Sequence, residues 1–343
     1  ESTGVNSSSG GGIGRTTAEM TTPYAANTYE FWDFSSGGPW TDDFLMLRND
    51  GYPLPRTLLH FSKKYSGGDG TAFTPYQIST PGDWVQLMIT QEDWEGKHFE
   101  LTADLDFQGY DLHCVGKEGI AFTGVFDGQY HKVSKGRIYF PENSYVGLFG
   151  NVDGDGATTG ILRNLTIEDF SVTGGEQVGI LAGYAKGAIQ RCEASGEVAG
   201  DGWVGGVCGQ FQGTLSYSSF RGSVAADYTR AGGLCGVINV SSVLSCRIDA
   251  VVQGTDYTGG LAGRAFHTDI EKCHVSGTVS GSDYSGGLAG LFTVSGSTIK
   301  AVSESSSSAT VTGAVYTGGL FGQASNLSLI NAYASGAVTG VRE

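Results

Sequence analysis

Apolar and polar residues alternate in short segments through the second half of the chain. In "IEKCHVSGTVSG", residues 270–281, small apolar residues occupy every second position from Cys273, and His274, Ser276 and Thr278 lie between them. Successive side chains of a β-strand point to opposite faces. The pattern therefore predicts strands with one buried face, and it predicts that His274 faces solvent.

Four other segments carry the same pattern, at residues 189–200, 215–226, 243–254 and 329–340. The face expected to be buried comprises, in the first, fourth and last copies in chain order, Cys192, Ala194, Gly196 and Val198; Cys273, Val275, Gly277 and Val279; and Ala332, Ala334, Gly336 and Val338.

A glycine-rich motif precedes these segments and recurs seven times. Its copies are "YVGLFG", "VGILAG", "VGGVCG", "AGGLCG", "TGGLAG", "SGGLAG" and "TGGLFG", which close at Gly150, Gly183, Gly209, Gly236, Gly263, Gly290 and Gly322. The steps between closing glycines are 33, 26, 27, 27, 27 and 32 residues. A fixed period of this length indicates a repeat architecture in which each unit stacks on its neighbours.

Stacked units of about 27 residues predict an all-β fold, a right-handed parallel β-helix. A β-sandwich also has short strands at regular spacing, but it does not need the same residue at the same place in each unit. A propeller blade needs about 40 residues. In the helix, equivalent residues of successive rungs form columns along the axis.

The paired pattern G-G-L-x-G and I-x-x-C-x-x-x-G-x-V resembles the GLUG motif, over roughly residues 120–340. That motif occurs in bacterial surface and adhesin-like proteins and in the non-catalytic part of some immunoglobulin-A-cleaving metalloproteases. The resemblance implies a right-handed β-helix on an exported protein, and it does not imply catalysis.

The N-terminal third divides into three expected parts. Residues 1–20 are Ser/Gly-rich and predict a flexible tether, residues 21–75 form an aromatic-rich segment, and the β-helix is expected over 76–343. Thr80, Pro81 and Asp83 form a capping-box sequence, which predicts a short amphipathic helix at 80–89 over the open end of the coil. Residues 99–107 and 122–140 are expected to be the first strands.

Composition narrows the possible partners. The formal charge is −15, no basic stripe is visible, and no apolar run approaches the roughly 20 residues that span a bilayer. Nucleic-acid binding and a transmembrane segment are therefore not expected. The chain starts at Glu1, as a processed exported protein or a fragment trimmed for expression would. We expect a secreted protein, or a bacterial surface protein held as a lipoprotein or tethered to the wall.

The six cysteines lack the C-x-x-C spacing of a zinc site. Cys192, Cys246 and Cys273 are expected to share one column, with Ser218 and Ala332 in equivalent positions. Cys208 and Cys235 are expected to be neighbours in another column. A disulfide between these two is an open alternative to two free thiols, although column neighbours seldom meet the required dihedral angle.

Catalytic and cofactor motifs are not apparent. The sequence has no H-E-x-x-H and no G-x-S-x-G, and no copy of the glycine-rich motif carries the Lys and Ser/Thr pair of a phosphate-binding loop. A β-helix glycosidase or lyase would be expected to carry paired carboxylates in a groove, but no column of Asp or Glu runs across the repeats. We expect no catalytic residue and no cofactor, with a carbohydrate-active enzyme as an alternative.

"NVDGDG" at 151–156 resembles half of a calcium loop, with Asn151, Asp153 and Asp155 as weak candidate ligands. An EF-hand would place a bidentate Glu at the twelfth position, where this chain has Leu162. The sequence favours an acidic turn inserted in a long rung. A second insertion is expected within 291–308.

The best binding candidates stand six positions before the closing glycines. They are Trp203, Tyr257, Tyr284 and Tyr316, in a column with Gln177 and Arg230, whereas Tyr145 is one residue off this register. The rings either stack and stabilise the coil, which the register favours, or form an exposed edge that holds a glycan or a host protein. The expected function is non-enzymatic surface adhesion or binding. The alternatives are an accessory region of an immunoglobulin-A protease, which the resemblance suggests, and the carbohydrate-active enzyme.

Overall fold

The structure is a computed structural model that describes residues 40–41, 54–55 and 64–340. The chain divides into two units, Glu1–Tyr65 and Ser66–Glu343. In the first unit, β1 (Trp40–Thr41) and β2 (Leu54–Pro55) pair antiparallel. The predicted tether at 1–20 lies outside the described residues, as does most of the aromatic-rich segment at 21–75.

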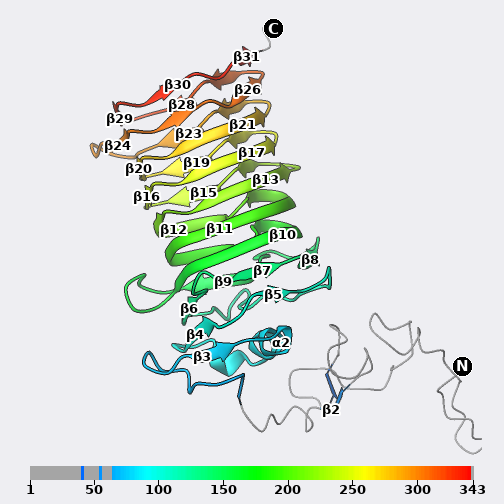
Figure 1. Ribbon diagram of the computed structural model, residues 1–343. Coiled ribbons are helices and arrows are strands. Elements are labelled where there is room, and N and C mark those ends of the chain that lie inside the picture. The colour runs from blue at the N-terminus through cyan, green and yellow to red at the C-terminus, as the bar shows by residue number, and fades with distance from the viewer. Residues whose placement is uncertain (1–39, 42–53, 56–63, 341–343) are drawn as a thin grey trace, which may run out of the picture. The chain divides into compact units, whose positions relative to one another are not determined.

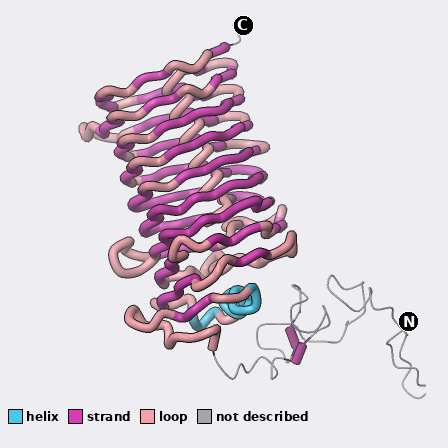
Figure 2. The backbone as a smooth tube through the Cα atoms, in the orientation of Figure 1, coloured by secondary structure: helices cyan, strands magenta, loops and turns pink. Residues whose placement is uncertain are grey.

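The second unit is a parallel β-solenoid, and its rungs stack along one axis (Figures 1 and 2). One regular turn contains β14 (Arg230–Gly232), β15 (Cys235–Asn239), β16 (Ser242–Leu244) and β17 (Arg247–Gln253). Each pairs in parallel with its equivalent one turn later, as in Arg230 with Tyr257. The predicted parallel β-helix is confirmed.

The remaining strands repeat this arrangement. The earlier full turns contain β9 (Phe149–Asp153), β10 (Ile161–Val178), β11 (Ala182–Gly205), β12 (Cys208–Ser216) and β13 (Ser219–Ala226). The later turns contain β18 (Tyr257–Gly259), β19 (Ala262–Phe266), β20 (Asp269–Glu271), β21 (His274–Ser280), β22 (Tyr284–Gly286), β23 (Ala289–Thr293), β24 (Lys300–Ser303), β25 (Ser306–Ser307), β26 (Thr310–Gly313), β27 (Tyr316–Gly318), β28 (Phe321–Ala324), β29 (Leu327–Ile330), β30 (Tyr333–Ala334) and β31 (Val338–Gly340).

A short helix and irregular rungs precede the regular coil. The predicted helix is α2 (Pro81–Ile89), and its capping box is complete: the Thr80 side chain accepts from the Asp83 amide, and the Asp83 carboxylate accepts from the Thr80 amide. The fully buried Trp84 makes edge-on contacts with Phe107, Phe126 and Phe149, so the helix covers the apolar interior as expected.

The expected entry segments form short strands around a 3-10 turn, η2 (Gln91–Asp93). The strands are β3 (Tyr76–Ile78), β4 (His98–Leu101), β5 (Leu105–Asp106), β6 (Val125–Asp127), β7 (Lys132–Ser134) and β8 (Arg137–Phe140).

The interior is built from columns, as the repeat predicts. Cys192 aligns with Ser218, whose hydroxyl accepts from the Cys192 amide at 3.1 Å, and the column continues through Cys246 and Cys273. Cys208 pairs in register with Cys235 in a second column. All six cysteines are free thiols, which decides the open disulfide alternative.

The last rung corrects one prediction. The face expected to be buried at 332–338 is partly open: Val338 is 46% exposed, whereas its column neighbour Val311 is fully buried. The sequence pattern is the same in both copies. Burial of an inward face requires a further layer above it, and among the described residues none follows β31.

Candidate functional site: a ladder of aromatic rings and a guanidinium

One corner of the solenoid carries a continuous ladder of planar side chains, here called the corner ladder. Its members are Trp203, Arg230, Tyr257, Tyr284 and Tyr316. They belong to β11, β14, β18, β22 and β27, and each is followed by an inward residue. Thr258 and Ser285, for example, are fully buried. Alternation along these short strands therefore turns the planar side chains outward.

Neighbouring members contact one another from Trp203 to Tyr316. The Arg230 guanidinium lies 5.3 Å from the centroid of the Trp203 ring and 5.6 Å from that of Tyr257. The rings of Tyr257 and Tyr284 stack at 4.9 Å, and those of Tyr284 and Tyr316 at 4.7 Å. These separations match the spacing of parallel strands, so the ladder follows directly from the register.

The ladder is stacked and also accessible to solvent. Tyr316 is 47% exposed, and the other members are half-buried. Because Tyr257 and Tyr284 have a planar neighbour on both faces, their accessible part consists of ring edges and phenol hydroxyls. Among the described residues, the hydroxyls of Tyr257 and Tyr284 are neither buried nor hydrogen-bonded, so they are free to meet water or a ligand.

Arg230 has a second arginine beside it. The backbone just before Arg264 passes close to the backbone just after Arg230: a Cβ on Gly263 would lie 2.9 Å from the amide nitrogen of Ala231. Arg264 therefore lies near Arg230 at the same corner. Burial, together with Arg264, lowers the pKa of Arg230. The Nε atoms of both arginines are buried without a hydrogen-bond partner, and neither guanidinium makes an ion pair within the described part of the chain.

The same column continues toward the N-terminus with a corrected register. Val146 pairs with Val178, so Tyr145 aligns with Gln177, and the expectation that Tyr145 stands one residue off is wrong. The segment from Tyr145 to Gly150 is one residue shorter than its equivalents, and this difference is absorbed after Tyr145. Its ring contacts Tyr184 at 6.0 Å.

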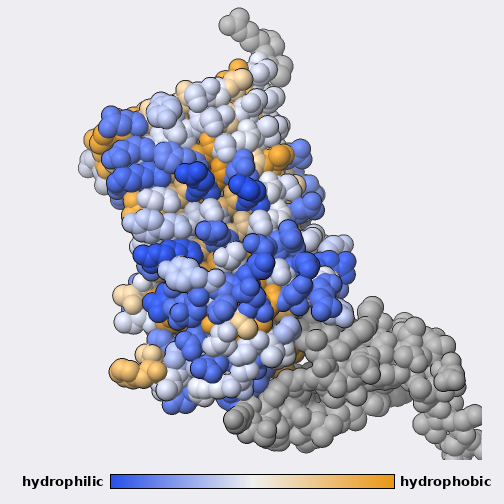
Figure 3. Space-filling model, in the orientation of Figure 1, coloured by the Kyte–Doolittle hydropathy of each residue, from blue (hydrophilic) through white to orange (hydrophobic). Residues whose placement is uncertain are grey.

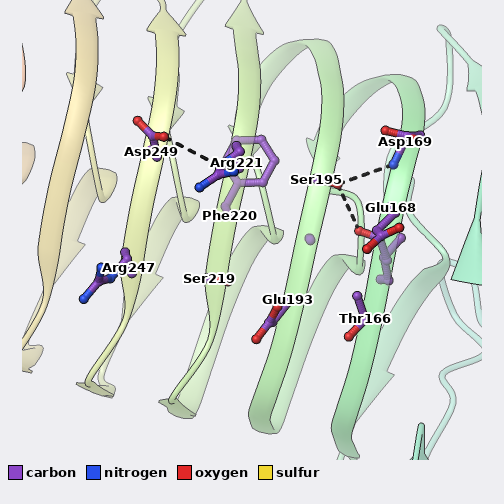
Figure 4. A pocket seen from close by; sticks show the side chains of 12 residues that line it. Thr166, Glu168, Asp169, Glu193, Ser195, Ser219, Phe220, Arg221, Arg247 and Asp249 are labelled. Atoms are coloured by element: carbon purple, nitrogen blue, oxygen red, sulfur yellow. Dashed lines mark hydrogen bonds and ion pairs between the residues drawn. The ribbon is translucent and has the colours of Figure 1, made fainter. Parts of the chain in front are cut away.

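A shallow groove of about 330 Å³ crosses the outer faces of β10, β11, β13 and β17 (Figure 4). It is lined by Glu168, Asp169, Glu193 and Asp249, with Arg221 and Arg247. The sequence did not point to this groove. Its residues share columns of the repeat, such as Glu193, Ser219 and Arg247, but the residue type at these positions changes from rung to rung.

The carboxylates of the groove are mostly solvated or paired. Asp249 lies 3.6 Å from Arg221, and Glu168 lies 3.1 Å from Lys132, with about half of each carboxylate side chain exposed. A glycosidase acid is typically held in a water-poor environment that keeps it protonated. The exposed ion pairs favour a solvated surface groove over a catalytic one.

The three candidate metal ligands point to different partners. The Asn151 amide donates to the Lys117 carbonyl, and Asp153 pairs with Lys186 at 3.1 Å. Asp155 accepts from the amides of residues 157, 158 and 159, which hold the pKa of its carboxyl well below the usual range. The acidic segment thus forms a self-capped turn in the long rung. No group of three metal-ligating side chains occurs within the described ranges.

The second insertion lies at residues 294–301, since Phe266 pairs with Thr293 but Ile270 pairs with Val302. His267 bonds to Ser295 in this loop at 2.7 Å.

As predicted, His274 faces solvent, where its ring bonds to the Ser306 hydroxyl at 2.9 Å. No helix in the part of the chain that the structure describes is both long and apolar enough to cross a membrane.

Comparison with known proteins places these repeats in a family context. The family model described as "The GLUG motif" matches residues 254–280. Halomucin of Haloquadratum walsbyi is 33% identical over 154 residues, which are 41% of this chain and 2% of halomucin. A protein of Evansella cellulosilytica named "Putative Gly-rich membrane protein" is 29% identical over 141 residues, or 38% of this chain and 15% of that protein. The chain spans only a small share of either relative.

A crystal structure at 1.30 Å resolution, described as that of "a putative immunoglobulin A1 protease from Bacteroides ovatus", is similar in fold. Its TM-score is 0.53 and its sequence identity 25%, over 79% of this chain and 78% of that one. The matched motif at 254–280 is one turn of the solenoid, and the turns around it repeat the same pattern in register. The chain thus carries a GLUG motif at residues 254–280, within a parallel β-solenoid whose turns repeat the same pattern.

Proposed function

We propose that this chain is an exported, non-enzymatic module of a bacterial surface protein, and that it binds a glycan along the corner ladder. The observation that carries the proposal is that the stacked tyrosines at the rung spacing leave the hydroxyls of Tyr257 and Tyr284 accessible. Their ring faces are occupied by stacking, so the row recognises a ligand through hydrogen bonds. A polymer of hydroxyl-bearing sugars offers partners at repeating intervals, as the ladder does.

The names of the two relatives, a halomucin and a Gly-rich membrane protein, are in keeping with a place at the cell surface. The GLUG repeats and the solved structure favour a non-catalytic β-helix region. If no glycan binds, a host protein is the expected partner.

The test is a glycan array probed with the native chain and with the double variant Tyr257→Phe/Tyr284→Phe. Phenylalanine keeps the stacked rings and removes both hydroxyls. Each lost hydrogen bond costs about 0.5–1.5 kcal/mol, so binding should weaken roughly tenfold without a change in melting temperature. Tyr139→Phe, at a 59% exposed tyrosine of β8, is the matched control. If the native chain binds no glycan, or if the double variant binds as well as the native chain, the proposal fails.

A second candidate function is an accessory region of an immunoglobulin-A-directed protease, which the structural likeness supports. In that case the intact protein would carry a metalloprotease domain elsewhere. Sequencing the complete gene for an H-E-x-x-H motif, and incubating the full-length protein with immunoglobulin A1, would test it. The absence of both motif and cleavage would exclude it.

A further inference from the structure

Two guanidinium groups without an acidic ion-pair partner lie at this corner of the solenoid: Arg230 in the corner ladder and Arg264 of β19 beside it. Arg230 lies between the Trp203 and Tyr257 rings, and Arg264 lies over the Phe266 ring at 5.3 Å. Elsewhere in the described residues, cations such as Arg163, Lys186 and Lys300 pair with a carboxylate within 3.1 Å. The acidic groups that act on Arg230 electrostatically are Asp256 and Glu176, but neither reaches it as an ion pair.

The surroundings of the two arginines favour an anion. The edge of an aromatic ring carries positive partial charge, and phenol hydroxyls donate hydrogen bonds, so the exposed side of the stacked tyrosines attracts negative charge. Like charges held side by side repel each other, and an anion between Arg230 and Arg264 would relieve that repulsion. The guanidinium fork also matches the two oxygens of a carboxylate.

This site is a local exception on an acidic chain. The formal charge of −15 repels polyanions at long range, but the Debye length is about 8 Å at physiological ionic strength. Distant carboxylates are therefore largely screened, whereas the two arginines act at contact distance.

Building on the proposed function, we propose that the glycan is an acidic one, whose sugars carry an anionic group that Arg230 and Arg264 bind while the neighbouring tyrosine hydroxyls bind the adjacent sugars. The anionic group is a uronate, a sialate or a sulfate ester, which share the chemistry of two or more acceptor oxygens on one negative centre. The tyrosines set the direction of the chain along the ladder, and the arginines select for charge.

Calorimetric titration of the full chain with matched ligand pairs tests this proposal. The pairs are tetragalacturonate and its methyl ester, sialyllactose and lactose, and a sulfated galactan oligosaccharide and its desulfated form. We expect at least one acidic member to bind ten- to a hundredfold more tightly than its neutral match, the range for a charge-assisted hydrogen bond. The pair that shows the preference identifies the anionic group.

Variants of the two arginines assign the preference to this site. Arg230→Gln is compatible with the fold, because Gln177 already occupies the same column, and both Arg230→Gln and Arg264→Gln should bind the acidic and neutral members equally. Arg230→Lys keeps the charge and should retain part of the preference. Arg247→Gln, in the groove across β10 to β17, is the matched control and should behave as the native chain.

The outcomes separate this inference from the proposed function. If the native chain binds the acidic and neutral members equally, and this binding weakens in Tyr257→Phe/Tyr284→Phe, the preference for an acidic glycan is wrong but the glycan site is retained. A charge preference that persists in both arginine variants would also overturn it. If no glycan binds the native chain, the proposed function fails as well.

Discussion

At the scale of single residues, the second glycine of the "GGL" motif lies where two rungs approach closely. A Cβ on Gly260 would lie 2.4 Å from the carbonyl oxygen of Gly287 in the next rung and 2.4 Å from Val275. A Cβ on the first glycine, Gly259, would lie 2.0 Å from the carbonyl oxygen of Ala262. The motif therefore keeps side chains out of a corner where backbone meets backbone.

Gly260→Ala should lower the free energy of unfolding by about 1–3 kcal/mol, the usual cost of overpacking. Urea denaturation followed by circular dichroism measures it. Gly82→Ala is the control: its nearest contact would be an ordinary 3.5 Å, and alanine favours the helix, so its stability should be unchanged or slightly raised. Equal stability of Gly260→Ala and the native chain would contradict the close approach.

The buried thiols make stability depend on pH. Burial raises the pKa of Cys192 to about 12, and it raises the pKa of Cys208 and of Cys235 well above the ordinary value. In the unfolded chain a thiol ionises near pH 8.5. Above that pH the unfolded state loses protons that the folded state keeps, so the free energy of unfolding should fall as pH rises from 8.5 toward 10.

The double variant Cys208→Ala/Cys235→Ala tests the origin of this fall. Alanine already fills the same column at Ala182, Ala262 and Ala289, so the variant should fold. Its stability should fall less steeply between pH 8.5 and 10, by up to about 1.4 kcal/mol per pH unit for each thiol removed. Identical slopes in the two proteins would show that these thiols are not the cause.

At the scale of elements, each strand is stabilised by equivalents one turn away, and α2 replaces the missing neighbour at the first end. Trp84→Ala should cost about 3–5 kcal/mol, since it removes a buried ring that touches three phenylalanines. In hydrogen exchange, amides of residues 98–140 should lose more protection than those of 257–280, because rungs contact only their neighbours. Trp84→Phe should be milder. A uniform loss along the solenoid would contradict this local coupling.

Much of this element arrangement follows from periodicity. The spacing of closing glycines predicts that Cys208 lies beside Cys235, and the capping-box sequence predicts the start of α2 at Pro81. The burial of the last rung does not follow, because Val311 and Val338 have the same pattern and different neighbours. The approach of Arg264 to Arg230 joins two columns around a corner, and a one-dimensional repeat carries no information about corners. The sequence does show that Arg230 occupies a position where the following rungs have tyrosine, and this difference could have drawn attention to the corner.

At the scale of the whole molecule, the face of the solenoid seen in Figure 3 is largely polar, with scattered hydrophobic patches. The buried interior is mostly apolar. The corner ladder crosses five successive rungs parallel to the axis. At about 4.8 Å per rung it is roughly 19 Å long. A long, regular site of this kind suits a repeating ligand better than a compact one.

The length of the ladder gives a further prediction. Affinity should rise with the number of sugars until the oligosaccharide spans roughly 19 Å, and longer chains should add little per binding event. Titration with a size-fractionated oligosaccharide series measures this dependence. An affinity that is already maximal with a single sugar would indicate a small isolated pocket in place of the ladder.

A crystal structure of the chain with the oligosaccharide that binds most tightly on the array would locate the binding site. We expect sugar density along the corner, with hydroxyls within hydrogen-bond distance of the Tyr257 and Tyr284 phenols and the anionic group against Arg230 and Arg264. Density in the groove across β10, β11, β13 and β17, with the ladder bare, would contradict this expectation.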